Sequence, residues 1–255
     1  MKPDTPASDE VVHAPHPPLT AYYAVEGERR AWVRGIFDRA APDYDRVEKL
    51  IALGSGSWYR RQALLRAGLA SGMRVIDVGT GTGLVAREAA QIVGRPELVV
   101  GVDPSPGMRE NAMLPPGLQL LEGAAESIPL PDRHANFVSM GYALRHVGDF
   151  ETAAREFFRV LKPGGIVCVL EITLPQSRFR TLLLKMYMRG VIPALSWIVA
   201  RDRETPTFLR YYWDTIEACV PPERVLATLE RAGFTSMKRH VEVGIFSEYV
   251  GVKPR

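Results

Sequence analysis

The chain contains the segment Val75-Ile76-Asp77-Val78-Gly79-Thr80-Gly81-Thr82-Gly83, in which a short apolar run leads into alternating glycines. Such a run is typical of a buried parallel strand, and residues 84–93 continue with the periodicity of a helix. Glycines between a strand and a helix permit a tight turn and let a ligand lie against the main chain. The segment therefore predicts a ligand-binding loop in an α/β fold.

Strands and helices alternate after this loop. Apolar runs predict further strands at 98–102, 118–121, 136–140 and 166–172. Helices are expected at 151–161 and 222–232, and residues 235–253 are expected to form two strands. This alternation predicts a Rossmann-like, doubly wound sheet of seven strands that is mostly parallel, with the last hairpin adding an antiparallel edge strand.

The segments outside this alternation predict a tail, an N-terminal helical region and an insertion. Residues 1–25 are rich in proline and lack apolar periodicity, which favours a flexible tail. Residues 26–255 are expected to form one domain, beginning with helices over about 26–53 and over 58–67. Residues 175–220 have an atypical helical pattern and are expected to form a lid inserted into this domain.

Length, charge and cysteine content exclude several classes. The chain has 255 residues, a formal net charge of +3 and two cysteines, Cys168 and Cys219. This length fits one α/β domain with an insertion, and the weak positive charge does not support a nucleic-acid partner. Two cysteines exclude a disulfide framework and the usual four-ligand metal cluster, so no metal is expected. Because no secretion signal and no run of 18 apolar residues is present, a cytoplasmic location is expected, with peripheral contact at the inner membrane left open.

The glycine spacing G-x-G-x-G differs from the dinucleotide pattern G-x-G-x-x-G, which brings a pyrophosphate to a helix N-terminus. S-adenosylmethionine (SAM) has no phosphate, and the acidic Asp77 beside the loop suits its ammonium group. Asp103 ends the next predicted strand, where it can accept hydrogen bonds from both ribose hydroxyls. Pro104 and Met108 follow, and an apolar side chain there suits the adenine face. These features predict SAM as the cofactor, bound by Asp103, Pro104, Met108 and the loop residues Asp77, Gly79, Thr80, Gly81, Thr82 and Gly83.

Three further segments resemble one methyltransferase family. They are Phe37-Asp38-Arg39-Ala40-Ala41-Pro42-Asp43-Tyr44-Asp45, Ala125-Glu126-Ser127-Ile128-Pro129-Leu130-Pro131-Asp132 and Ala143-Leu144-Arg145-His146-Val147. With these segments the chain resembles, from about Ile36 to its C-terminus, the ubiquinone/menaquinone-biosynthesis C-methyltransferase family, whose motif after the fourth strand is Gly-Leu-Arg-Asn-Val. The resemblance implies cofactor contacts at Tyr44, Thr82, Asp103, Ala124, Ala125 and Gly141.

The sequence departs from the family pattern at three positions. Leu84 follows the third glycine, where the family usually has an acidic residue, and Ala124 replaces an Asp or Asn that caps the adenine amino group. His146 replaces the Asn of the Leu-Arg-Asn motif. The last change falls at the expected reaction site, so it leaves open an acceptor other than a family quinol.

Candidate catalytic residues lie at the ends of two predicted strands. Arg145 and His146 follow the fourth strand, and Glu171 lies near the end of the fifth, where ligands bind in open α/β sheets. Arg145 can hold a phenolate or orient a water, and His146 titrates in a range suited to a base. The alternatives are that Arg145 pairs with Asp149 or Glu171 to stiffen its loop, that His146 is a solvated loop residue, and that Glu171 is structural.

The expected lid is rich in apolar and aromatic side chains. They are Phe179, Met186, Tyr187, Met188, Trp197, Phe208, Tyr211, Tyr212 and Trp213. We interpret them as covering an apolar acceptor, with a prenyl tail as one form of it, at or near a membrane; an ordinary core or homodimer contact is the alternative.

The leading hypothesis is a SAM-dependent enzyme that C-methylates a small apolar, quinol-like or other aromatic molecule after a ring hydroxyl is deprotonated. Two alternatives remain open at this stage. One is an N- or O-methyltransferase acting on a lipid headgroup or secondary metabolite. The other is a SAM-fold protein that serves as a non-catalytic partner subunit.

Overall fold

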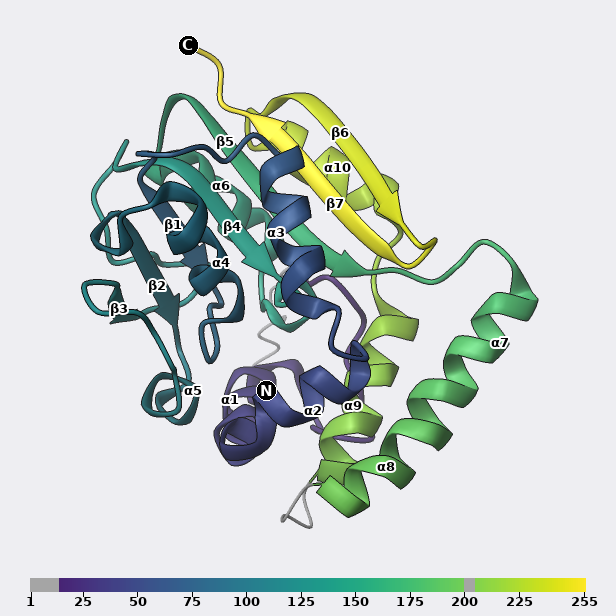
Figure 1. Cartoon of the computed structure of the whole chain (residues 1–255). Helices are drawn as coiled ribbons and strands as arrows, with labels where there is room; N and C mark the ends of the chain where they lie inside the picture. The colour runs from purple at the N-terminus through teal and green to yellow at the C-terminus, as the bar shows by residue number, and fades with distance from the viewer. Residues whose placement is uncertain (1–13, 200–204) are drawn as a thin grey trace, which may run out of the picture.

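A computed structural model describes residues 14–199 and 205–255 and contains one seven-stranded sheet (Figure 1). Its strands are β1 (Val75–Val78), β2 (Val99–Asp103), β3 (Gln119–Glu122), β4 (Ala135–Gly141), β5 (Leu161–Ile172), β6 (Thr235–Glu242) and β7 (Phe246–Val252). Their order across the sheet is β3-β2-β1-β4-β5-β7-β6. The predicted doubly wound, Rossmann-like arrangement is confirmed.

The pairing of the strands explains where the sheet changes direction. β1 pairs in parallel with β2 and β4, so the expected ligand loop after β1 lies at the centre of the sheet. β7 pairs antiparallel with both β5 and β6, and the last hairpin thus completes the edge. β5 begins at Leu161, earlier than the expected start at residue 166, because Leu161 already pairs with Ala135 of β4. The register then shifts, and the regular pairing resumes at Phe137 and Ile166.

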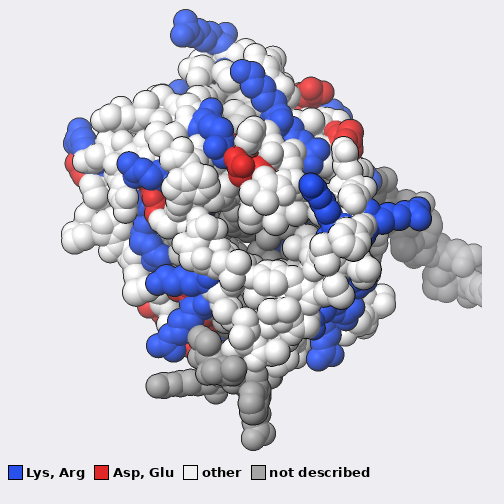
Figure 2. Space-filling view, turned by 45° about the vertical axis from the view of Figure 1, so that its right-hand side comes forward, with Lys and Arg blue, Asp and Glu red and all other residues white. Residues whose placement is uncertain are grey.

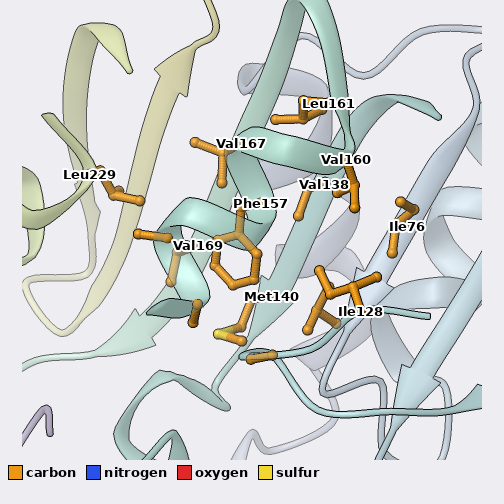
Figure 3. Close-up of a cluster of buried hydrophobic side chains, with 14 of the residues drawn as sticks. Ile76, Ile128, Val138, Met140, Phe157, Val160, Leu161, Val167, Val169 and Leu229 are labelled. Carbon is orange, nitrogen blue, oxygen red and sulfur yellow. The ribbon is translucent and has the colours of Figure 1, made fainter. Parts of the chain in front are cut away.

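Two helical layers cover the faces of the sheet. The helices are α3 (Gly56–Arg66) and α4 (Leu84–Val93) on one face, and α6 (Phe150–Val160) and α10 (Pro222–Arg231) on the other. Figure 3 shows Phe157 of α6 against Val138 of β4 and Val167 and Val169 of β5, all with no exposed surface. Burying each such side chain contributes about 1.5–3 kcal/mol, so this packing fixes the strand ends that carry the site.

A third group of helices lies beyond the carboxyl ends of the strands (Figure 1). It comprises η1 (Glu26–Glu28), α1 (Arg29–Ala40), η2 (Ala41–Asp43), α2 (Tyr44–Ile51), α7 (Arg178–Met186), the π-helical η5 (Tyr187–Val191), α8 (Ile192–Val199) and α9 (Thr205–Ala218). Three shorter elements lie in the loops: η3 (Pro96–Leu98) just before β2, α5 (Pro106–Glu110) after β2, and η4 (Leu144–His146) after β4. Buried Ile36, Val47, Ile192, Phe208 and Trp213 join these helices in a core of their own.

The apolar side chains of the expected lid divide between this core and the surface. Met188, Phe208, Tyr211, Tyr212 and Trp213 are buried, whereas Phe179 and Met186 are more than half exposed. The side chain of Trp197 lies outside the described part of the chain. The segment is therefore partly core and partly an apolar surface.

Residues 14–25 of the expected tail pack against the helical group. His16 and Tyr23 are buried, the backbone amide of Val220 donates to the carbonyl of Pro15 at 2.7 Å, and Tyr22 Oη donates to Asp214 at 2.5 Å. Residues 1–13 lie outside the described residues. None of the described helices is both long and apolar enough to cross a bilayer.

Candidate active site

Two cavities meet at the carboxyl ends of the central strands. The first cavity has a volume of about 420 Å³, within the range of small-molecule sites. Most of the expected cofactor residues line it: Tyr44, Gly79, Gly81, Asp103, Pro104, Met108, Ala124, Ala125 and Gly141. The structure thus brings together residues from separate segments of the chain that the sequence had assigned to one ligand.

Asp103 is held ready to accept hydrogen bonds at the end of β2. Its carboxylate accepts from the backbone amides of Gly81 at 2.7 Å and Ser105 at 2.9 Å. Burial raises the pKa of Asp103 to about 6, and these amides act in the opposite direction. Because the side chain also lines the first cavity, it fits the expected ribose contact.

Asp77 lies beneath the loop and does not line either cavity. Its carboxylate accepts from Thr80 Oγ1 and from Ser139 Oγ, each at 2.6 Å. Burial raises the pKa of Asp77 to about 6, against the lowering effect of these hydroxyls. In this arrangement Asp77 fixes the loop to β4 and places a negative charge under the first cavity.

The two ends of the loop have different structural roles. Thr82 Oγ1 donates a short hydrogen bond to Asp45 of α2, which also accepts from Arg87 at 2.9 Å. Gly83 directly precedes α4 and has φ +90°, in the left-handed region. A Cβ at this position would collide with Leu114. Thr82 and Gly83 do not line either cavity, whereas Gly79 and Gly81, with φ +65° and +57°, expose backbone to both. The loop therefore fits a cofactor that lies against the main chain.

The second cavity lies on the other side of the loop, under α2, α3 and the lid. Its volume is about 110 Å³, similar to the ~150 Å³ apolar cavity that holds benzene in an engineered protein. Apolar and aromatic side chains dominate its wall, including Val47, Ile51, Met188, Phe208 and Phe246. Tyr44, Gly79, Gly81, Gly141 and Tyr142 line both cavities. A group bound in one cavity can thus face a group bound in the other.

Arg145 and Glu171 form a fully buried ion pair and line neither cavity. Arg145 Nε also donates to Thr215 of α9 at 3.0 Å, and its guanidinium lies 4.2 Å from the ring centre of Tyr212. Burial raises the pKa of Glu171, while the Arg145 charge acts to lower it. These contacts join η4, β5 and α9. They agree with the alternative in which Arg145 pairs with Glu171 and stiffens its loop.

His146 lines the first cavity beside aromatic rings. Its Nδ1 lies 3.0 Å from Tyr211 Oη, and the ring of Phe37 packs edge-on at 4.8 Å. Burial, with the neighbouring charge of Arg145, holds the pKa of His146 well below its usual range. The imidazole is therefore neutral near pH 7, and its Nε2 has no hydrogen-bond partner within the described residues.

Sequence reasoning missed three residues of the second cavity. Glu48 and Arg60 form an ion pair between α2 and α3, and neither belongs to a recognisable motif. Tyr142 has φ +59°, an uncommon conformation for an aromatic residue, and it separates the cavities after β4. Because Tyr142 directly follows Gly141, an expected cofactor contact, the sequence could have placed it at the site. The Glu48–Arg60 pair could not be placed in this way, because it depends on how two helices pack.

Comparison with known proteins agrees with this geometry. Residues 24–253 match the model of the ubiE/COQ5 methyltransferase family. The ubiquinone/menaquinone biosynthesis C-methyltransferase of Syntrophotalea carbinolica is 34% identical over 86% of this chain and 93% of that protein. The demethylmenaquinone methyltransferase of Chlorobaculum tepidum is 32% identical over 84% of this chain and 89% of that protein.

Solved structures show the same fold at lower identity. A SAM-dependent methyltransferase from Thermotoga maritima matches with a TM-score of 0.60 and 23% identity, over 87% of this chain and 99% of that one. Phosphoethanolamine N-methyltransferase 2 of Haemonchus contortus, in complex with SAM, matches with a TM-score of 0.56 and 16% identity, over 78% and 53% of the two chains.

The family match over residues 24–253, together with the sheet order and the glycine loop, defines a SAM-dependent methyltransferase. SAM is its cofactor. Within this class, the chain belongs to the ubiE/COQ5 methyltransferase family.

Proposed function

We propose that the protein transfers the methyl group of SAM to a ring carbon of a small apolar, quinol-type aromatic acceptor. The observation that carries this proposal is the shared wall between the two cavities, where three glycines, Gly79, Gly81 and Gly141, present no side chain. SAM in the first cavity can direct its sulfonium methyl through this wall. The second cavity, apolar and sized for one ring, suits an aromatic acceptor, and the names of the relatives point to quinones.

The reaction needs positioning and the management of protons. Loss of a ring hydroxyl proton gives a phenolate, whose adjacent carbon attacks the methyl group as the carbon–sulfur bond breaks. The products are the methylated ring and S-adenosylhomocysteine, with one proton released when the ring regains aromaticity. SAM supplies the activated methyl, so the protein has to align the ring and stabilise the phenolate.

For the cofactor, we propose that Asp103 accepts from the ribose hydroxyls and that Met108, Ala124 and Ala125 border the adenine. Tyr44 closes over the amino-acid end, and Asp77 acts through the loop that it holds. His146, the base candidate from the sequence, lines the first cavity and not the second, so we assign it to the cofactor side and not to the proton of the acceptor ring. For Arg145 and Glu171 we favour a supporting role, because neither lines a cavity.

An outer groove offers a path for a tail on the acceptor. It is lined by Pro175, Arg180, Leu183, Leu184, Tyr187, Val243 and Ile245. Leu184, Tyr187 and Ile245 also line the second cavity, so the two spaces adjoin. Because the second cavity has room for little more than a ring, we propose that an apolar tail leaves it along this groove.

The groove opens beside an exposed apolar face on α7, η5 and α8. This face consists of Phe179, Leu182, Leu183, Met186, Val191 and Leu195. Arg178, Arg180 and Arg189 are exposed on the same segment, and residues 172–201 contain no Asp or Glu. Figure 2 shows more Lys and Arg than Asp and Glu on this side of the molecule. We propose that the exposed apolar face contacts an anionic membrane surface, where a tailed acceptor would reside.

Co-sedimentation with vesicles tests the membrane contact. The protein should bind vesicles containing an anionic lipid, and the variant Leu182→Ser/Met186→Ser should bind at least about tenfold more weakly, since it removes two apolar anchors. Leu65→Ser, which changes an exposed leucine of α3, should bind as the unchanged protein does. Equal binding by all three proteins, or dimerisation through this face without lipid binding, would rule the proposal out.

A panel of acceptors tests the reaction. The protein, SAM and reduced quinols with short and long tails should yield S-adenosylhomocysteine and a product heavier by one methyl group, detected by mass spectrometry. Asp103→Asn, impaired in cofactor binding, should give much less product under the same conditions. Turnover of amines or lipid headgroups with no turnover of quinols would instead establish the N-methyltransferase alternative.

A further inference from the structure

The second cavity contains a pair of charged residues in a wall that is otherwise uncharged over the described residues. Among the described residues that line it, Glu48 and Arg60 alone carry formal charge. Arg60 Nη2 donates to Glu48 Oε1, and the side chains are 4% and 17% exposed, respectively. A charged pair is costly in such an apolar place unless it makes good hydrogen bonds or binds a ligand. This pair lies outside the cofactor site and outside the Arg145–His146 motif.

The chain is shaped locally to hold this pair. Glu48 lies in the last turns of α2 and Arg60 in the second turn of α3, so the pair spans the turn between the two helices. Gly56 begins α3 directly beside them. A Cβ on Gly56 would collide with Glu48 Oε1 and lie 2.7 Å from Arg60 Nη1, so a larger residue there would have to displace the ends of both side chains.

The hydrogen bonding of Arg60 is incomplete. The residue is only 3% exposed, and its Nε has no hydrogen-bond partner among the described residues. Its guanidinium carbon lies 5.7 Å from the centre of the Tyr142 ring, at the wall shared with the first cavity. A guanidinium that lines the cavity wall beside the place where methyl transfer would occur suits an oxygen atom of a ligand.

We infer that Glu48 and Arg60 bind and ionise the ring hydroxyl of the acceptor, an inference that rests on the proposed function. The hydroxyl of a phenol or quinol enters between them. Glu48 takes its proton, and Arg60 donates to the resulting phenolate oxygen, so that the electron pair can move into the ring. The ring carbon takes the methyl group from SAM as the carbon–sulfur bond breaks and S-adenosylhomocysteine is left. The carbon-bound proton then leaves to water and the ring is again an aromatic phenolate. Glu48 then returns its proton to the oxygen.

The pair also defines a chemical class of acceptor. Its ligand must combine an apolar ring, for the wall of Val47, Phe208 and Phe246, with a hydroxyl that can become an anion. An acceptor that lacks this hydroxyl leaves Arg60 without its ligand and gives no nucleophilic ring carbon. A methoxy analogue of an active quinol, blocked at that oxygen, should therefore be a poor acceptor.

Two variants and their neighbours test the inference. Glu48→Gln and Arg60→Met should each lower kcat for a quinol by about 100-fold or more, within the usual contribution of general base catalysis, while the Kd for SAM changes less than about twofold. Lys49→Gln, an exposed neighbour on α2, and Arg61→Met, next to Arg60 on α3, should keep the original kcat. Unfolding curves for all four variants show whether the native fold is retained.

A second readout does not depend on turnover. 4-Nitrophenol, whose phenolate absorbs visible light, should bind the SAM-loaded protein with an apparent pKa below its value in water. The shift should vanish in Arg60→Met and persist in Arg61→Met. An unchanged kcat in Glu48→Gln, or an unshifted nitrophenol in the original protein, would overturn the inference. If no quinol is methylated but nitrophenol still ionises on Arg60, the proposed function fails and the phenol site remains.

Discussion

Asp103 combines a structural task with the proposed binding of the ribose in one carboxylate. It accepts from the amides of Gly81 and Ser105, which fixes the glycine loop against α5, and it still faces the first cavity. On the proposed binding mode, the ribose therefore meets an acceptor that is already oriented. Such preorganisation lowers the entropic cost of binding the cofactor.

The raised pKa values of Asp77 and Asp103 predict a pH-dependent affinity for SAM. Both lie at about 6, so lowering the pH through 6 protonates the groups that favour the ribose hydroxyls and the ammonium. The affinity should be constant above pH 7 and fall by up to about tenfold per unit for each group below pH 6. Calorimetric titration of SAM at several pH values from 5 to 8 measures this change in affinity. A flat profile would show that neither carboxylate must be ionised.

Removing the charge of Asp103 separates its contribution to SAM affinity from that of Asp77. Asp103→Asn should weaken SAM binding on the order of 10- to 100-fold at pH 7.5, because it loses hydrogen bonds to a charged group worth about 1.5–3 kcal/mol. Its remaining pH dependence should reflect Asp77 alone. An affinity equal to that of the original protein would place the ribose elsewhere.

Gly141 tests the shared wall between the cavities. A Cβ at this position would lie 2.5 Å from Val85 Cγ2, so Gly141→Ala should destabilise the protein by about 1–3 kcal/mol and reduce methyl transfer. Chemical denaturation measures the first effect and the quinol assay the second. Gly190→Ala is the matched control, since nothing lies within 4 Å of that Cβ. Equal behaviour of the two variants would contradict the tight packing at Gly141.

The Arg145–Glu171 pair joins three elements rather than lining a cavity. Through it, η4 after β4 and the end of β5 are tied to α9 of the lid, where Arg145 also contacts Thr215 and Tyr212. The lid is thereby held over the strand ends. On this account, loss of activity in an Arg145 variant follows from loss of the lid.

A second substitution, at Glu171, distinguishes a supporting role of Arg145 from a catalytic one. Arg145→Met should lower the free energy of unfolding by about 3–5 kcal/mol, because it leaves Glu171 buried without its partner. Arg145→Met/Glu171→Leu should recover much of that stability, and methyl transfer should recover with it. If the double variant is stable but inactive, Arg145 or Glu171 takes part in the chemistry itself.

The alternation of strands and helices was predictable because each element carries its own period and its own breaking residues. The glycine loop and Asp103 were predictable for a related reason: a few residues in one short stretch determine a ligand contact. The partner of Arg145 was open between Asp149 and Glu171, since the choice depends on how η4 packs against β5. The Glu48–Arg60 pair could not be predicted, because it forms only when α2 and α3 pack around Gly56.

In the molecule as a whole, the sheet and its helices support the helical group that closes the site. The first cavity is bounded on one side by strand ends and on the other by α1 and Tyr44, so SAM bound as proposed would contact both parts. A SAM concentration 100 times its Kd should raise the free energy of unfolding by about 2.7 kcal/mol. Amide exchange should slow in α1 and α2 as well as in the loop. Protection confined to the loop would indicate that α1 and α2 do not close over the cofactor.

The position of the transferred methyl group decides the proposed reaction. With SAM carrying a ¹³C-labelled methyl group and a reduced quinol as acceptor, NMR of the product distinguishes a methyl on a ring carbon from one on oxygen. The two adjoining cavities and the Glu48–Arg60 pair predict a carbon-bound methyl next to a free hydroxyl. An oxygen-bound methyl, or no labelled product from any quinol, would contradict the account.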